Sequence, residues 1–140
     1  MSATQAATGV ALMGGLIGLI VSALLPEPPP IMVASITYEN GMITVDRDII
    51  GDGNTSVYMR RSTELLDGNG ERVLHCAGIA DINYPVGHVV RTVPLAQFIG
   101  EPACTPDSLA PGLYTPNTIY VAGDRQVQAR GETFRIGGAP

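Results

Sequence analysis

Two cysteines and two histidines are the residues of this sequence best suited to metal or thiol chemistry. Cys76 and Cys104 belong to no C-x-x-C pair, and His75 and His88 do not complete a zinc-ligand spacing with them. Neighbouring residues of a strand point to opposite faces, so His75 and Cys76 would not share a metal. The even number of cysteines in a β-rich chain instead predicts a Cys76–Cys104 disulfide, formed in an oxidising compartment. Two unpaired buried thiols in a cytoplasmic domain are the alternative.

Acidic and amide side chains gather in two turn-like segments where calcium could bind. The first segment holds Asp46, Asp48, Asp52 and Asn54, and the second holds Asp67, Asn69 and Glu71. Neither matches the calcium loop D-x-[DN]-x-[DN]-G with its distal Glu. Asp-Gly and Asn-Gly pairs are also what β-turns use for positive φ. We therefore expect turns and no bound metal or cofactor, and calcium binding stays an alternative.

The sequence contains no group of residues that resembles a catalytic site. A nucleophile needs a base and an orienting group, and no Ser or Cys here has such a context. Carboxylates for glycan cleavage could be taken from Asp46, Asp48 and Glu64, but nothing in their spacing selects them. We expect a protein that is not an enzyme, with a glycan-acting or cell-wall enzyme as the minority alternative.

Charge argues against nucleic acid as a partner. The net charge is −5, and all eight basic residues are Arg, without a basic cluster. Nucleic-acid binding depends on neutralising phosphates, which this distribution does not favour. Arg and Tyr side chains are enriched at protein interfaces. Those we expect to be exposed and available to a protein partner are Arg60, Arg61, Arg91, Tyr84 and Tyr120.

Short alternating segments separated by turn residues must position these side chains. The expected strands are 33–38, 42–46, 56–62, 64–66, 72–77, 88–93, 113–120 and 126–136, with a short helix at 94–99 and no assignment for 80–87. Asn40-Gly41 is a favoured two-residue hairpin turn. Frequent turns and the lack of a long amphipathic helix predict an all-β fold, an antiparallel β-sandwich. Its expected core is Ile36, Ile43, Val45, Val57, Met59, Val73, Leu74, Val89, Leu95, Tyr114, Ile119, Val121, Val127, Phe134 and Ile136.

The stretch Leu109-Ala110-Pro111-Gly112-Leu113-Tyr114 resembles the Leu-x-Pro-Gly-x-Tyr corner of immunoglobulin-like and fibronectin type III-like domains. The resemblance implies an immunoglobulin-like sandwich in which Leu109 fills the core and the Tyr114 hydroxyl bonds back to the upstream backbone. The chain departs from antibody-type domains because it has no Trp and because Cys104 precedes Tyr114. The usual inter-sheet disulfide of that family is therefore not implied.

An uncharged apolar stretch at the N-terminus predicts a single membrane-spanning helix. Residues 6–25 carry no charge and would measure about 30 Å as a helix, the thickness of a bilayer's hydrocarbon core. A cleaved signal peptide with a small-x-small site at Val21-Ser22-Ala23 is the main alternative, although no Lys or Arg precedes the core. A buried core helix is the third. The starting Met1 favours the uncleaved anchor.

Small residues Gly14, Gly18 and Ser22 recur every four positions along this helix. Such a strip lets two helices pack closely in lipid, so we expect self-association or docking on a partner helix. The expected organisation is the N-terminal segment and helix (1–25), a Pro-rich spacer (26–31), the β-sandwich (32–136) and a flexible tail (137–140). A disulfide would place the sandwich outside the cytoplasm.

This layout of one span, a stiff spacer and a small immunoglobulin-like domain resembles accessory envelope proteins of bacteria and their phages. The resemblance implies a single-pass membrane protein without catalytic activity. Its helix would lie in the bilayer, and its sandwich would bind protein partners in assembly or adhesion. The alternative is a membrane-tethered accessory or sensor domain that binds calcium or a small ligand through the Asp-rich turns.

Overall fold

The computed structural model describes residues 28–51 and 53–138, where almost all regular structure is β-strand. The strands form two antiparallel sheets, which confirms the predicted all-β class. The expected membrane helix within residues 1–25, with its strip Gly14, Gly18 and Ser22, lies outside the described residues. Within those residues, no helix is long and apolar enough to cross a bilayer.

The smaller sheet has the strand order β1-β2-β5. Its strands are β1 (Ile31–Glu39), β2 (Met42–Ile49) and β5 (Gly87–Pro94). Asn40 and Gly41 join β1 to β2 with φ of 52° and 82°, the positive values that a two-residue hairpin turn requires. The predicted turn is confirmed because this signal is local: Asn and Gly reach positive φ at little cost.

The larger sheet has the order β4-β3-β6-β7, with β8 paired to β6. Its strands are β3 (Ser56–Leu66), β4 (Arg72–Pro85), β6 (Gly112–Ala122), β7 (Arg125–Arg130) and β8 (Phe134–Ile136). The segment 80–87, left unassigned from the sequence, mostly continues β4. Asp81 and Asn83 are tolerated there because their side chains lie exposed on the outer face.

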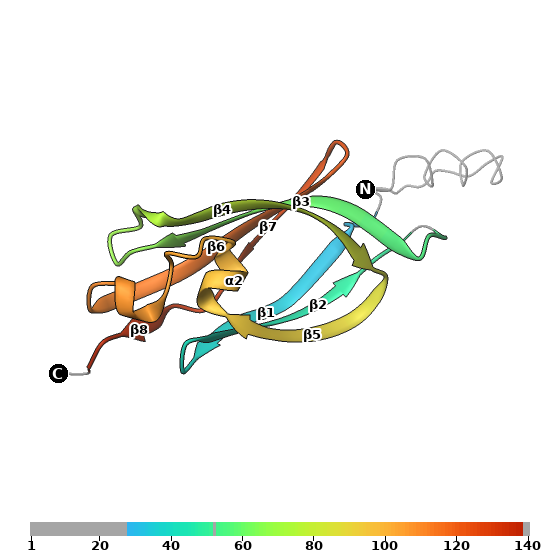
Figure 1. Cartoon of the computed structure of the whole chain (residues 1–140). Helices are drawn as coiled ribbons and strands as arrows, with labels where there is room; N and C mark the ends of the chain where they lie inside the picture. Colours follow the sequence, from blue (N-terminus) through green and yellow to red (C-terminus); the bar gives the residue numbers. More distant parts are fainter. Residues whose placement is uncertain (1–27, 52, 139–140) are drawn as a thin grey trace, which may run out of the picture.

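The two sheets face each other as two layers (Figure 1). On one side, β4 passes through Val86 directly into β5, so one continuous stretch of chain crosses from the larger sheet to the smaller. On the other side, the backbone N–H of Glu132 donates to the carbonyl oxygen of Ile36 at 2.9 Å and joins the segment after β7 to β1. The connection at Val86 and this hydrogen bond each join the two layers, and the chain also changes sheet between β2 and β3 and between β5 and β6.

The space between the sheets contains two groups of buried apolar side chains. The larger comprises Ile36, Ile43, Val45, Leu65, Cys76, Leu95, Phe98, Ile99, Cys104, Leu109, Tyr114, Phe134 and Ile136. The smaller comprises Ile31, Ile49, Met59, Tyr84 and Tyr120. Polar side chains are buried in this interior as well, among them Arg47, Thr63 and Thr118.

A short helix closes part of the opening beside β4 and β5. Helix α2 (Leu95–Ile99) buries Leu95, Phe98 and Ile99, and it contacts β2, β3, β4 and β5. It ends at Gly100, whose φ of 83° is the left-handed conformation common at a helix C-terminus. The loop that follows contains a single 3₁₀ turn, η1 (Pro106–Ser108). The helix predicted at 94–99 is thus present at nearly the predicted bounds.

Several predicted core positions are wrong. Leu74 is 79% exposed. On β6 the sequence-based core contained Ile119 and Val121, whereas the structure buries Thr118 and Tyr120 on the inward face. The hydroxyl of Thr118 meets that of Thr63 on β3, 3.5 Å away, so a polar pair occupies a place where apolar residues were expected.

Candidate functional site

The predicted disulfide is confirmed. Cys76 on β4 and Cys104 in the loop after α2 form it, with a Cα–Cα distance of 5.0 Å, and both residues are fully buried. The bond ties the loop between α2 and β6 to the larger sheet. Because both thiols are consumed in it, the zinc set of His75, Cys76, His88 and Cys104 does not come together. His75 instead lies 3.2 Å from the Ser108 hydroxyl through its Nε2.

The segment before β6 forms the contacts of a tyrosine corner. The Tyr114 hydroxyl donates to the carbonyl oxygen of Ala110 at 2.6 Å. Leu109 is buried in the larger core group. Pro111 and Gly112 make the bend between Leu109 and Tyr114, and Gly112 has a φ of 155°. This arrangement fixes the direction in which the chain enters β6.

The acidic segments act as turns and ion pairs. The Asp67 carboxylate accepts hydrogen bonds from the backbone N–H groups of Asn69 and Glu71, at 2.8 and 3.0 Å. Asp46 pairs with His88, and Asp52 lies outside the described residues. In the part of the chain that the structure describes, no group of three or more His, Cys, Asp and Glu is arranged to hold a metal ion.

His88 and Asp46 form an exposed pair that changes the pKa of the histidine. The His88 Nε2 lies 2.7 Å from Asp46 Oδ1, and the hydrogen bond to this carboxylate raises the pKa of His88 above its usual value. A raised pKa means that the pair stabilises the fold below the ordinary histidine pKa, and that this contribution disappears as pH rises through the raised value. We expect Asp46→Asn to lower the pKa of His88 in an NMR titration; an unchanged pKa would show that the pair does not form.

The residues expected at an exposed binding surface are only partly there. Arg60 is exposed, with its Nε 2.9 Å from Asp81. Tyr84 and Tyr120, however, are only 3% and 1% exposed, so the prediction that they are surface anchors is wrong. Both rings lie between the sheets, 6.1 Å apart in an edge-to-face arrangement. Arg61 also points inward from β3.

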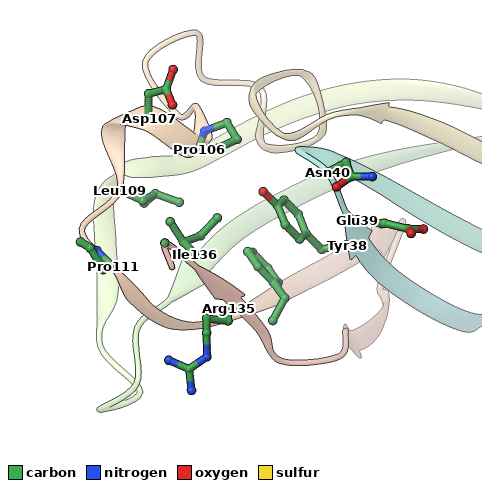
Figure 2. Close-up of a pocket in the computed structure, with 11 residues that line it drawn as sticks. Tyr38, Glu39, Asn40, Pro106, Asp107, Leu109, Pro111, Arg135 and Ile136 are labelled. Carbon is green, nitrogen blue, oxygen red and sulfur yellow. The ribbon is translucent and has the colours of Figure 1, made fainter. Parts of the chain in front are cut away.

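A hollow of about 620 Å³ lies at one end of the sandwich, between the β1–β2 turn, the loop with η1, and β8. Tyr38, Leu109 and Ile136 point toward one another in its centre (Figure 2). The Tyr38 ring is stacked on Phe134, with centroids 4.0 Å apart and an interplanar angle of 16°. The charged groups of Glu39, Asp107 and Arg135 lie around this apolar centre and point away from it (Figure 2).

The hollow lies far from the start of the first strand. Figure 1 shows the beginning of β1 at one end of the molecule, and the β1–β2 turn, η1 and β8 at the other. An apolar centre with a charged rim is the usual composition of a protein-binding patch. We define this group of residues, Tyr38, Glu39, Asp107, Leu109, Phe134, Arg135 and Ile136, as the distal hollow.

A second cavity, of about 300 Å³, lies between the sheets beside α2. Arg47, Arg61 and Arg91 line it together with Tyr84 and Tyr120. Sequence reasoning missed Arg47, although its signal was present: Ile43, Val45, Arg47 and Ile49 alternate on one face of a strand. Applied strictly, this alternation predicts that the Arg47 side chain lies on the buried face of the strand.

No protein-family model and no curated protein matches the sequence. Among solved structures, the chain is similar to wild-type OgpA from Akkermansia muciniphila, with a TM-score of 0.43 and 11% identity. The match covers 81% of this chain and 31% of that one, so this chain corresponds to less than a third of its length. The similarity is too slight to bear on what the chain binds.

Proposed function

We propose that the chain is a non-catalytic, single-pass membrane protein whose immunoglobulin-like β-sandwich contacts another protein outside the cytoplasm. In this proposal residues 1–25 anchor the chain, residues 26–31 space the sandwich from the lipid, and the role is assembly or adhesion in a bacterial envelope or phage virion. The Cys76–Cys104 disulfide supports an oxidising compartment. The Tyr114–Ala110 hydrogen bond supports the immunoglobulin-like arrangement.

The observation that carries the proposal is the position and composition of the distal hollow. A sandwich anchored through its N-terminus would present this end farthest from the membrane, because β1 begins at the opposite end (Figure 1). Leu109, Phe134 and Ile136 supply buried apolar floor, and Tyr38 adds a half-buried ring. Aromatic floors inside charged rims are favoured at protein contacts because the rim excludes water from the centre.

Site-specific photo-crosslinking tests this proposal in membranes of cells that produce the full chain. A benzophenone amino acid at Glu39, on the rim of the distal hollow, is expected to give one discrete adduct with a protein. The same group at Asp124, in the turn between β6 and β7, is the control and should give none. Equal adducts at both positions, or none at Glu39, would contradict a contact at the distal hollow.

Intact mass tests the placement of the sandwich. The protein is purified from membranes without reductant and weighed before and after alkylation. A full-length mass with both cysteines blocked supports an uncleaved anchor and an external sandwich. Free thiols in a full-length protein would indicate that the sandwich lies on the cytoplasmic side. Loss of about the first 23 residues would indicate a cleaved signal peptide in place of an anchor.

The anchor's strip of small residues gives a separate prediction. We expect an oligomer of the full chain in detergent, and we expect Gly14→Leu or Gly18→Leu to dissociate it because a large side chain separates the helix backbones. Leu16→Ile, on the opposite side of the predicted helix, is the control. Sedimentation in a density-matched detergent measures the change. An oligomer that survives both glycine substitutions would exclude the strip as its interface.

A further inference from the structure

Three arginines from three strands point into the cavity between the sheets. Arg47 comes from β2, Arg91 from β5 and Arg61 from β3, so both layers contribute. Strand alternation puts each of them on the inward face, where a sandwich normally places apolar residues. We call this space the arginine cavity. Val45, Ile82, Tyr84, Val93, Phe98 and Tyr120 also line it.

The arginine cavity contains no carboxylate. No Asp or Glu is among its lining residues, and none of these three arginines forms an ion pair within the described part of the chain. Arg47 is only 8% exposed. A buried cation that no anion neutralises lowers the stability of the fold. The chain has more acidic than basic residues, yet none of its carboxylates is placed in this cavity. The concentration of positive charge therefore needs a reason.

Polar atoms in this cavity lack partners. The Nε atoms of Arg47 and Arg61 and the hydroxyl of Tyr84 are buried without a hydrogen bond. The Arg61 guanidinium lies near the Tyr84 hydroxyl, but no hydrogen bond of good geometry joins them. Buried polar atoms in native proteins usually have a hydrogen-bond partner, because a buried donor without one loses its bonds to water and gains nothing in return. The three atoms come from three different strands and line one space.

The guanidinium groups are held in place by aromatic rings. The Cζ of Arg47 lies 5.0 Å from the centre of the Tyr84 ring, and that of Arg61 lies 5.4 Å from the centre of the Phe98 ring. Arg61 also donates from one terminal nitrogen to the carbonyl oxygen of Phe98 at 2.8 Å. Each group is thus oriented before any ligand arrives, and preorganised donors bind anions with less loss of entropy.

We propose that the arginine cavity binds a small organic anion, a carboxylate or phosphate monoester attached to an apolar or aromatic body. The guanidinium groups and the Tyr84 hydroxyl would take the anionic oxygens, because arginine matches planar carboxylate and phosphate groups with paired hydrogen bonds. Val45, Ile82, Val93 and Phe98 line the same space and suit the apolar body. Its volume of about 300 Å³ limits the ligand to a small molecule.

Exposure increases from the interior of the cavity outward. Arg47 is buried, Arg61 is half-buried and Arg91 is exposed. An anion approaching from solvent would meet Arg91 first and reach Arg47 last. Cations along such a path raise the local concentration of an anionic ligand and speed its association.

The tyrosine stays a hydrogen-bond donor throughout the physiological range. Burial raises the pKa of Tyr84 above its usual value, although Arg61, Arg47 and Arg91 oppose that rise. Burial likewise raises the pKa of Tyr120 to about 12. Neutral phenols and charged guanidinium groups both donate to an oxyanion, so the donor set is complementary to a negative ligand.

Ligand-observed ¹⁹F NMR on the full chain in non-ionic detergent tests the proposal. The probes are 4-fluorophenyl phosphate and 4-fluorobenzoate, with neutral 4-fluorobenzyl alcohol as their analogue and protein-free micelles as the blank. We expect both anions to bind at least about tenfold more tightly than the alcohol, because only they pair with arginine. Inorganic phosphate should compete more weakly, because it lacks the ring. Equal binding of anion and alcohol would overturn the proposal, and so would no binding of either anion.

Adjacent arginines on β3 provide the matched control. Arg61→Met and Arg47→Met should each weaken the anionic probes by about tenfold or more, because each removes a charge-assisted donor. Arg60→Met removes the same charge from the outer face of the same strand and should leave binding within about twofold. Equal weakening in Arg60→Met would mean that net charge, not the cavity, attracts the probes.

Folding of the variants is checked in the same samples. Arg47→Met is expected to raise the midpoint of urea unfolding while it weakens the anionic probes, because it replaces a buried cation that no carboxylate neutralises with an apolar side chain of similar length. This pairing of effects separates lost binding from lost structure. The distal hollow shares no lining residue with the arginine cavity, so failure here would leave the proposed function standing. A destabilised Arg47→Met would show that the arginine serves the stability of the fold itself, and the argument for a bound anion would be lost.

Discussion

Reduction of the Cys76–Cys104 disulfide is expected to lower the free energy of unfolding by about 3.5 kcal/mol. The two cysteines are separated by 28 residues along the chain. Closing a loop of that size removes conformational entropy from the unfolded chain, and the loop-entropy relation gives about that value at 25 °C. The effect should exceed that of most single substitutions, because typical ones cost about 1 kcal/mol.

Urea unfolding with and without a phosphine reductant measures this difference. The double variant Cys76→Ala, Cys104→Ala is the control. Its free energy of unfolding should be equal to or below that of the reduced protein, and the reductant should not change it. Both sulfur atoms lie in the fully buried core, so the alanines also leave small voids. A wild-type midpoint that stays unchanged after complete reduction, verified by mass, would show that the fold does not depend on the bond.

The disulfide has a local structural role that explains where the loss would appear. The loop between α2 and β6 contains only η1 as regular structure. Cys104 attaches this loop to β4, and Leu109 and the Tyr114–Ala110 hydrogen bond attach its far end to the core. The wall of the distal hollow formed by Pro106, Asp107 and Leu109 belongs to the same loop. Reduction should therefore loosen the distal hollow before the rest of the sandwich.

Local signals in the sequence were the ones that predicted the fold correctly. Asn40-Gly41 specified its hairpin because the turn needs positive φ at both residues, and no distant contact alters that requirement. The short helix after Pro94 was predicted for a comparable reason, since proline suits the first turn of a helix. The Cys76–Cys104 pair followed from a count of two, which leaves one possible pairing.

Strand faces were harder to predict because they depend on the partner sheet. The segment from Tyr114 to Tyr120 carries apolar residues on both faces of the strand. Hydrophobicity alone favours Ile119 over Tyr120 as the core residue, although the pairing register buries Tyr120. Pairing with β3 sets Thr118 opposite Thr63 and Tyr120 opposite Arg61, so the inward face is fixed by the neighbouring strand. A single sequence does not contain that pairing.

The arginine cavity could be predicted least, because charged residues are normally assigned to the outside. The alternation that puts Val57, Met59 and Arg61 on one face of a strand is visible in the sequence. Only the structure shows that Arg47 from the opposite sheet faces the same space. Sites that break the usual pattern of burial are often functional, because stability alone would remove them.

Gly78→Ala is expected to destabilise the fold by about 3 kcal/mol, at the upper end of overpacking effects. Gly78 lies on the inward face of β4, where a methyl group would overlap the carbonyl oxygen of Ile99 at the end of α2. Rotating a side chain cannot relieve this overlap, because the obstructing atom belongs to the backbone. Helix α2 must move, or β4 must leave its register with β3.

Gly68→Ala is the matched control, since its methyl group would meet only Leu113 at an ordinary distance of 3.8 Å and its φ is not positive. We expect that substitution to change stability by no more than about 0.5 kcal/mol. Urea unfolding measures both. A Gly78→Ala protein as stable as Gly68→Ala would show that α2 is not packed against β4.

Displacement of α2 should also reach the arginine cavity. Phe98 and Gln97 from the helix line that cavity, and the Phe98 ring and carbonyl oxygen hold Arg61. We therefore expect the folded fraction of Gly78→Ala to bind 4-fluorophenyl phosphate more weakly, although no donor has been removed. Stability and anion binding depend on the same helix, because the residues that close the core beside β4 are also those that orient the guanidinium group.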